Sequence, residues 1–136
     1  MKVLVDTSVW SLALRRSQPA DSPVVTELIE LIREVRGQLI GPVRQELLSG
    51  IKNQVQFQKL RDHLQAFPDL EITTRDYESA AEFFNLCRGK GIQGSNTDFL
   101  ICAIAARHNI PIFTTDEDFT LFQPHLPIML HRPRTL

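Results

Sequence analysis

The sequence contains few cysteines and histidines, and their positions argue against the commonest metal site. Its two cysteines, Cys87 and Cys102, both lie in apolar helical patterns, which is typical of reduced thiols in a protein core. Its four histidines show neither the H-x-x-x-H nor the H-E-x-x-H spacing, and none lies near the acidic positions described below. A zinc centre is therefore not expected.

Long apolar runs and glycine-rich phosphate loops are also missing. No apolar run approaches the roughly 20 residues of a membrane span, and the first ten residues, MKVLVDTSVW, are typical of a first strand rather than a signal peptide. Neither G-x-x-x-x-G-K-[ST] nor G-x-G-x-x-G occurs, which excludes a P-loop and a Rossmann nucleotide site. We expect one soluble domain over residues 1–136, in the cytoplasm and without a membrane partner.

The chain has no large excess of charge of either sign. Its 15 basic and 16 acidic residues give a net charge of −1, which at first sight argues against a polyanionic substrate. Four of the acids stand out by position, and if a metal ion neutralises them, the remaining surface is mildly basic.

Short apolar runs alternate with amphipathic helical patterns along the chain. We expect strands at residues 3–5, 38–41, 70–72, 111–114 and 126–130. Residues 99–106 are apolar on every side and predict a central helix. Strands that alternate with helices favour a mostly parallel sheet with helices on both faces, so we predict an α/β fold with three layers, α/β/α.

Four acidic residues stand at or just after the predicted strands. Asp6 follows the run VLV, Glu46 comes shortly after LIG, Asp98 begins the apolar helix and Asp116 follows PIFTT. The carboxyl ends of parallel strands meet at one edge of a sheet, where these acids would converge. Each acid alone has an ordinary explanation as a helix cap or a solvated residue. Two carboxylates ~4 Å apart repel by roughly 4 kcal/mol at an effective dielectric of 20, so the group predicts a Mg²⁺ site that Mn²⁺ can also fill.

Three segments carry a resemblance to a known family. They are VLVDTSVW, GPVRQELLSG and GSNTDFLICAIAARHNIPIFTTDEDF. These segments resemble the PIN-domain ribonucleases, most closely the VapC-type toxins of bacterial toxin-antitoxin modules. The resemblance covers nearly the whole chain. It implies catalytic and metal-binding roles for Asp6, Glu46, Asp98 and Asp116, with Asp118 as an auxiliary metal ligand. It also implies supporting hydroxyl groups at Thr7, Ser8 and Thr114. The sequence departs from the family pattern at Gly41-Pro42, where many members carry Ser or Thr.

The resemblance implies an endoribonuclease, and the residues agree with that chemistry. No Ser-His-Asp or Cys-His set is apparent, so a metal-activated water is the expected nucleophile. One Mg²⁺ ion and two are both reasonable for four carboxylates. The candidate RNA contacts are basic residues in segments that flank the acids: Arg15, Arg16, Lys52, Arg88 and Lys90. The resemblance further implies a homodimer and a cognate antitoxin that inserts a peptide into the acidic groove.

Other functions stay open at the level of sequence. The chain could be a PIN-like module that binds RNA or protein without cleavage, or a housekeeping RNA-processing nuclease. A haloacid-dehalogenase-like phosphatase also begins with a strand and an aspartate, but it needs a second Asp two positions later, where this chain has Ser8. The presence of all four acids favours the nuclease.

Overall fold

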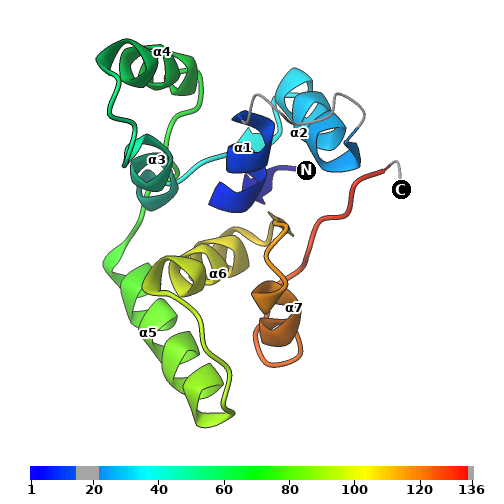
Figure 1. The fold of residues 1–136 in the computed structure, drawn as a ribbon. Coiled ribbons are helices and arrows are strands. Elements are labelled where there is room, and N and C mark those ends of the chain that lie inside the picture. The colour runs from blue at the N-terminus through cyan, green and yellow to red at the C-terminus, as the bar shows by residue number, and fades with distance from the viewer. Residues whose placement is uncertain (15–21, 135–136) are drawn as a thin grey trace.

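The computed structural model describes residues 1–14 and 22–134 (Figure 1). The strands are β1 (Val3–Val5), β2 (Gly37–Gln38) and β3 (Ile112–Phe113). The helices are α1 (Thr7–Leu14), α2 (Pro23–Arg33), α3 (Gly41–Leu48), α4 (Gln54–Leu64), α5 (Thr74–Gly89), α6 (Asn96–His108) and α7 (Asp118–Phe122). Within these described ranges, no helix is both long and apolar enough to cross a bilayer.

The three strands form a parallel sheet in the order β2-β1-β3. The chain leaves β1 through α1 and α2 and returns as β2 on one side, whereas β3 pairs with the other side of β1. Such a change of direction next to the central strand leaves a crevice at the carboxyl ends of the strands, where open α/β sheets bind ligands. Val5 is in register with Phe113, which brings the next residues, Asp6 and Thr114, side by side in that crevice.

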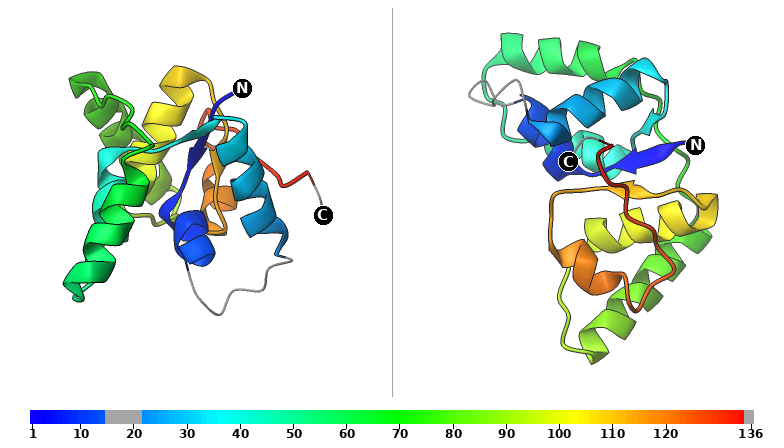
Figure 2. Two further views of the ribbon diagram at one scale, coloured as in Figure 1. Left: turned by 90° about the horizontal axis from the view of Figure 1, so that it is seen from above. Right: turned by 90° about the vertical axis from the view of Figure 1, so that its right-hand side faces the viewer.

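Helices cover both sides of the sheet, as the predicted three-layer α/β/α fold requires. Figure 2, in its left view, shows β1 between α2 on one side and α6 with α5 on the other. The three residues of β1 are fully buried, because helices pack over both faces of the central strand. The predicted fold class is confirmed.

The apolar segment predicted as a central helix forms α6. All residues from Phe99 to Ala105 are buried in it. Ser95 caps its first turn, and Asn109 ends it in the left-handed conformation at φ 56°. This helix fixes the position of Asp98, since that residue lies in its first turn.

Two of the five predicted strands are wrong. Residues 70–72 contribute no bridge, because the single bridge in this part of the chain joins the preceding residue, Asp69, to Leu39. Residues 126–130 contribute one bridge, Leu130 with Ile112. The first segment is short because the N-cap of α5 follows at Thr73. In the second, Pro127 has no N–H group to donate to a ladder, and pairing is confined to the residues around Leu130.

Candidate metal centre

Asp6 lies directly after β1 and is held by three hydrogen-bond donors. Its Oδ1 accepts from the Thr7 amide at 2.8 Å, and its Oδ2 accepts from the Ser8 hydroxyl at 2.9 Å and the Thr114 hydroxyl at 2.8 Å. Asp6 is only 6% exposed, and these donors offset the cost of placing a carboxylate there. Thr7, Ser8 and Thr114, the three residues predicted to support the site, therefore all donate a hydrogen bond to Asp6, Thr7 through its amide and the other two through their hydroxyl groups.

Thr114 connects Asp6 to the loop that carries the next two acids. While its hydroxyl donates to Asp6, the same oxygen accepts from the Asp116 amide at 2.9 Å. Asp116 Oδ1 in turn accepts from the Asp118 amide at 2.9 Å. A chain of short hydrogen bonds thus fixes the backbone from the end of β3 to the start of α7.

Asp98 comes from a different element, the first turn of α6. Its Oδ2 accepts from the Ser95 amide at 3.0 Å, and its own amide donates to the Ser95 hydroxyl at 3.1 Å, which together form a capping box. Burial raises the pKa of the Asp98 carboxyl, and the negative charges of Asp6 and Asp116 raise it further, against the lowering effect of the Ser95 hydrogen bonds. The half-buried Asp98 is therefore a carboxylate that a nearby cation would stabilise.

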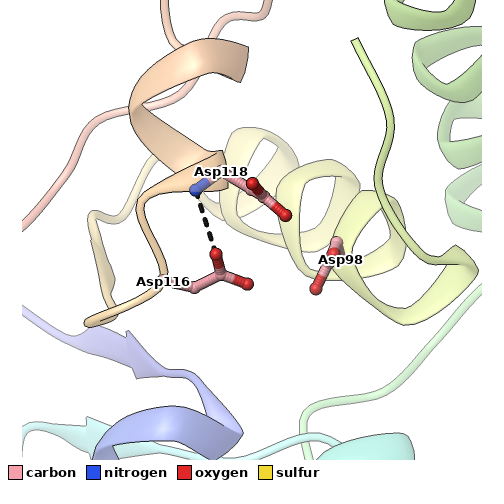
Figure 3. A group of neighbouring side chains, drawn as sticks. All are labelled: Asp98, Asp116 and Asp118. Atoms are coloured by element: carbon pink, nitrogen blue, oxygen red, sulfur yellow. Dashed lines mark hydrogen bonds between the residues drawn. The ribbon is translucent and has the colours of Figure 1, made fainter.

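Asp98, Asp116 and Asp118 point toward one another (Figure 3). Each offers one carboxylate oxygen, and these oxygens all lie within 4.8 Å of one another. The donor set contains only carboxylate oxygens, which Mg²⁺ and Mn²⁺ prefer to the nitrogen and sulfur ligands typical of zinc. The residues present thus fit a hard divalent cation, with two ligands from the β3–α7 segment and one from α6.

Asp6 and Glu46 border this group without joining it. Glu46 lies on α3 and is exposed, and its Oε1 accepts a hydrogen bond of 2.7 Å from the Thr7 hydroxyl. Because the Thr7 amide also donates to Asp6, this one residue connects both carboxylates. The structure therefore brings Glu46 next to Asp6, while Asp118, predicted only as auxiliary, is a full member of the three-acid group.

The predicted RNA contacts are distributed over several elements. Lys52, Arg88 and Lys90 are exposed, and the guanidinium of Arg88 lies 5.2 Å from the ring centroid of Phe84. Arg15 and Arg16 lie outside the described residues. A role in RNA binding remains a prediction for all five.

Sequence reasoning missed a buried acid on α2. Glu27 is 1% exposed; its Oε2 lies 2.6 Å from Nε2 of His131, and its Oε1 accepts from Nε of Arg134 at 2.8 Å. The signal was present, because Glu27 lies on the same helical stripe as Leu28 and Leu31, where an apolar residue is expected. This pair of contacts anchors the C-terminal segment, residues 128–134, to α2.

Comparison with known protein families identifies one match. The family model described as PIN domain matches residues 3–122, which include every acid of the candidate centre. No curated protein sequence matches the chain significantly.

Several solved structures share the fold. FitAcB from Neisseria gonorrhoeae is 23% identical, with a TM-score of 0.77, and the match covers 98% of this chain and 99% of that one. VapBC2 from Rickettsia felis, solved with a DNA fragment from its promoter, is 20% identical with a TM-score of 0.73, over 96% and 98% of the two chains. VapBC-5 from Mycobacterium tuberculosis, a member of the VapBC family of toxin-antitoxin systems, is 17% identical with a TM-score of 0.70, over 97% and 99%.

Proposed function

The chain belongs to the PIN-domain family, and we propose that it is a Mg²⁺-dependent endoribonuclease that acts as the toxin of a bacterial type II toxin-antitoxin system. The observation that carries the nuclease proposal is the group of three aspartates, whose oxygens lie within 4.8 Å of one another at the carboxyl edge of the sheet. The toxin proposal is supported by the likeness in fold, over 97% of this chain, to VapBC-5, a member of the VapBC family of toxin-antitoxin systems.

Asp98, Asp116 and Asp118 would hold the metal ion. When bound, the ion would lower the pKa of a water molecule and neutralise charge on the scissile phosphate. No step requires a protein nucleophile, and the Ser8 and Thr114 hydroxyls instead donate hydrogen bonds that hold Asp6 in place.

The neighbouring residues of the chain set the geometry of that centre. Asp6 fixes the Thr114 hydroxyl, which holds the amide of Asp116 and so orients the loop of the metal-binding acids. Thr7 holds one oxygen of Glu46 and leaves the other to accept a hydrogen bond from a water or a ribose hydroxyl. Asp6 thus positions the metal-binding loop, and Glu46 is placed to accept a proton. Metal binding by Asp6 and Glu46 themselves, which the family resemblance implies, stays part of this proposal.

Metal dependence tests the nuclease proposal directly. Purified protein is incubated with RNA after chelation, and single metals are then added back. We expect cleavage with Mg²⁺ or Mn²⁺ and none with Ca²⁺, whose longer and looser coordination binds without aligning the attack. Asp98→Asn should abolish cleavage, whereas Glu78→Gln, which removes an exposed carboxylate on α5, should not. Equal cleavage without any metal would contradict the mechanism.

The toxin role is tested in cells. Induced expression in the cytoplasm of a bacterial host should arrest growth, and Asp6→Asn or co-expression of a cognate antitoxin should relieve the arrest. An Arg side chain of the antitoxin could replace the metal charge among the acids, because its planar fork matches carboxylates bidentately. Cleavage in vitro without growth arrest would instead identify a housekeeping nuclease. Binding of RNA without cleavage under any metal would identify a binding module.

A further inference from the structure

A hollow of about 340 Å³ lies next to the acidic centre, between two segments that are distant in sequence. One segment runs from the end of β3 through α7 and contributes Thr114, Asp116 and Gln123. The other is the C-terminal segment and contributes Leu130 and Arg132. The volume of the hollow falls at the lower end of the range for ligand pockets. Asp116 belongs both to the hollow and to the metal-binding group, so the two sites are adjacent.

The C-terminal wall of this hollow is fixed in place. The His131 amide donates to the Ile112 carbonyl at 2.7 Å, and the His131 ring packs edge-on against Phe113 at a centroid distance of 5.3 Å. Further along, the buried Glu27 anchors both the His131 ring and the Arg134 guanidinium. Figure 1 shows this segment running from the region of α7 up past β3 toward α2. Arg132 is therefore held between two anchored residues.

The two arginines of this segment differ in their surroundings. Arg134 forms ion pairs with Glu27 at 2.8 Å and with Glu34 at 2.9 Å, so its charge is neutralised by carboxylates of the same chain. Arg132 is exposed in the hollow, and among the residues that the structure describes no carboxylate lies within ion-pair distance of it. Asp116 and Glu117 also line the hollow, but neither forms an ion pair with Arg132. The guanidinium of Arg132, beside a phosphodiester-cleaving centre, is therefore suited to binding a second, non-reacting phosphate.

We propose that this hollow is the subsite for the RNA nucleotide adjacent to the scissile phosphate, with Arg132 binding the flanking phosphate and Gln123 contacting the base. The inference rests on the proposed ribonuclease function. It adds a substrate-binding surface to the basic residues predicted from the sequence to contact RNA, since Arg132 is not among them. The side chains of Leu130 and Pro133 supply apolar surface in the hollow against which an unstacked RNA base can rest.

Kinetics of Arg132→Gln test the subsite. Arg61→Gln is the matched control, because it removes the same charge from α4, an element that contributes nothing to the hollow. With a single-stranded RNA substrate and Mg²⁺, we expect Arg132→Gln to raise KM roughly tenfold and to change kcat less than twofold, since the contact is made equally in the ground and transition states. Gln123→Ala should change the base preferred next to the cleavage site.

Salt dependence provides an independent readout. Binding of a fluorescent single-stranded oligonucleotide is measured in the cleavage-deficient Asp98→Asn background over a range of salt concentrations. A plot of the logarithm of the association constant against the logarithm of the salt concentration has a negative slope. Loss of one phosphate contact should make that slope less negative by about 0.7. Arg61→Gln should leave that slope unchanged.

The outcomes separate the subsite from the proposed function. If the wild type cleaves no RNA with any metal, the proposed function fails. If the wild type cleaves but Arg132→Gln matches Arg61→Gln in KM and in salt slope, the ribonuclease stands and the subsite is wrong. If Arg132→Gln leaves RNA binding unchanged but weakens binding of a co-expressed antitoxin, the hollow serves a protein partner and the proposal is overturned.

Discussion

Replacing Asp98 by Asn should stabilise the metal-free protein while abolishing its activity. The carboxylate oxygens of the three-acid group lie within 4.8 Å of one another, and two unit charges at that distance repel by about 3.5 kcal/mol at an effective dielectric of 20. Solvent reduces this figure, because Asp98 is only half-buried and Asp118 is exposed. An Asn side chain keeps an oxygen that can accept from the Ser95 amide, so the capping box survives. We therefore expect a gain of about 1 kcal/mol, or roughly 3–4 °C in Tm.

The pH dependence of this effect follows from the raised pKa of Asp98. Burial and the neighbouring acids raise the pKa of the folded carboxyl, so the folded state binds the proton more tightly than the unfolded chain does. The stability that protonation confers is fully present below the unfolded pKa of about 3.9 and is lost as pH rises through the folded pKa. The advantage of Asp98→Asn should accordingly be present at pH 7 and disappear toward pH 4.

Metal should reverse the order of the two proteins. Mg²⁺ at 100 times its Kd stabilises the wild type by about 2.7 kcal/mol, and the variant, which lacks one ligand, should gain less. The assay is thermal unfolding in chelator and in Mg²⁺ at several pH values, with Glu78→Gln as the control for loss of a carboxylate elsewhere. If Asp98→Asn is less stable than the wild type in chelator at pH 7 and gains equally from Mg²⁺, then Asp98 belongs to no repulsive, metal-binding group.

Three further perturbations address the packing and the hydrogen bonds around the site. Gly94→Ala places a Cβ 2.6 Å from a buried phenylalanine ring, so urea unfolding should show a loss of about 1–3 kcal/mol, whereas Gly89→Ala, with nothing within 4 Å, should not. Burial opposes ionisation of Glu27, but its hydrogen bonds from the C-terminal segment hold its pKa below the ordinary value. Glu27→Gln should therefore cost about 2 kcal/mol at pH 7, measured by denaturation, and this difference should shrink as pH falls through the folded pKa. Thr7→Val should lower the RNA cleavage rate about tenfold by releasing Glu46, with activity restored by Thr7→Ser; an unchanged rate would remove this contact from the mechanism.

The sequence was sufficient to predict those parts of the fold whose structure depends only on the residues of one short segment. The apolar run 99–106 became a buried helix because no side of it can face water. The acids at the ends of the apolar runs were identified for the same reason, since a charge next to a buried strand marks where the strand ends. The parallel sheet followed from the alternation of strands and helices.

Tertiary structure alone decided which of these acids meet. Asp98, Asp116 and Asp118 form one group because α6 lies beside the segment that follows β3, whereas Asp6 and Glu46 are held by hydroxyl groups at its border. The lengths of the strands also depended on pairing partners, so residues 126–130 formed a single bridge in place of a strand. Burial of a charge such as Glu27 requires partners more than a hundred residues away, and the position of such partners is set by the packing of the whole chain rather than by any local pattern.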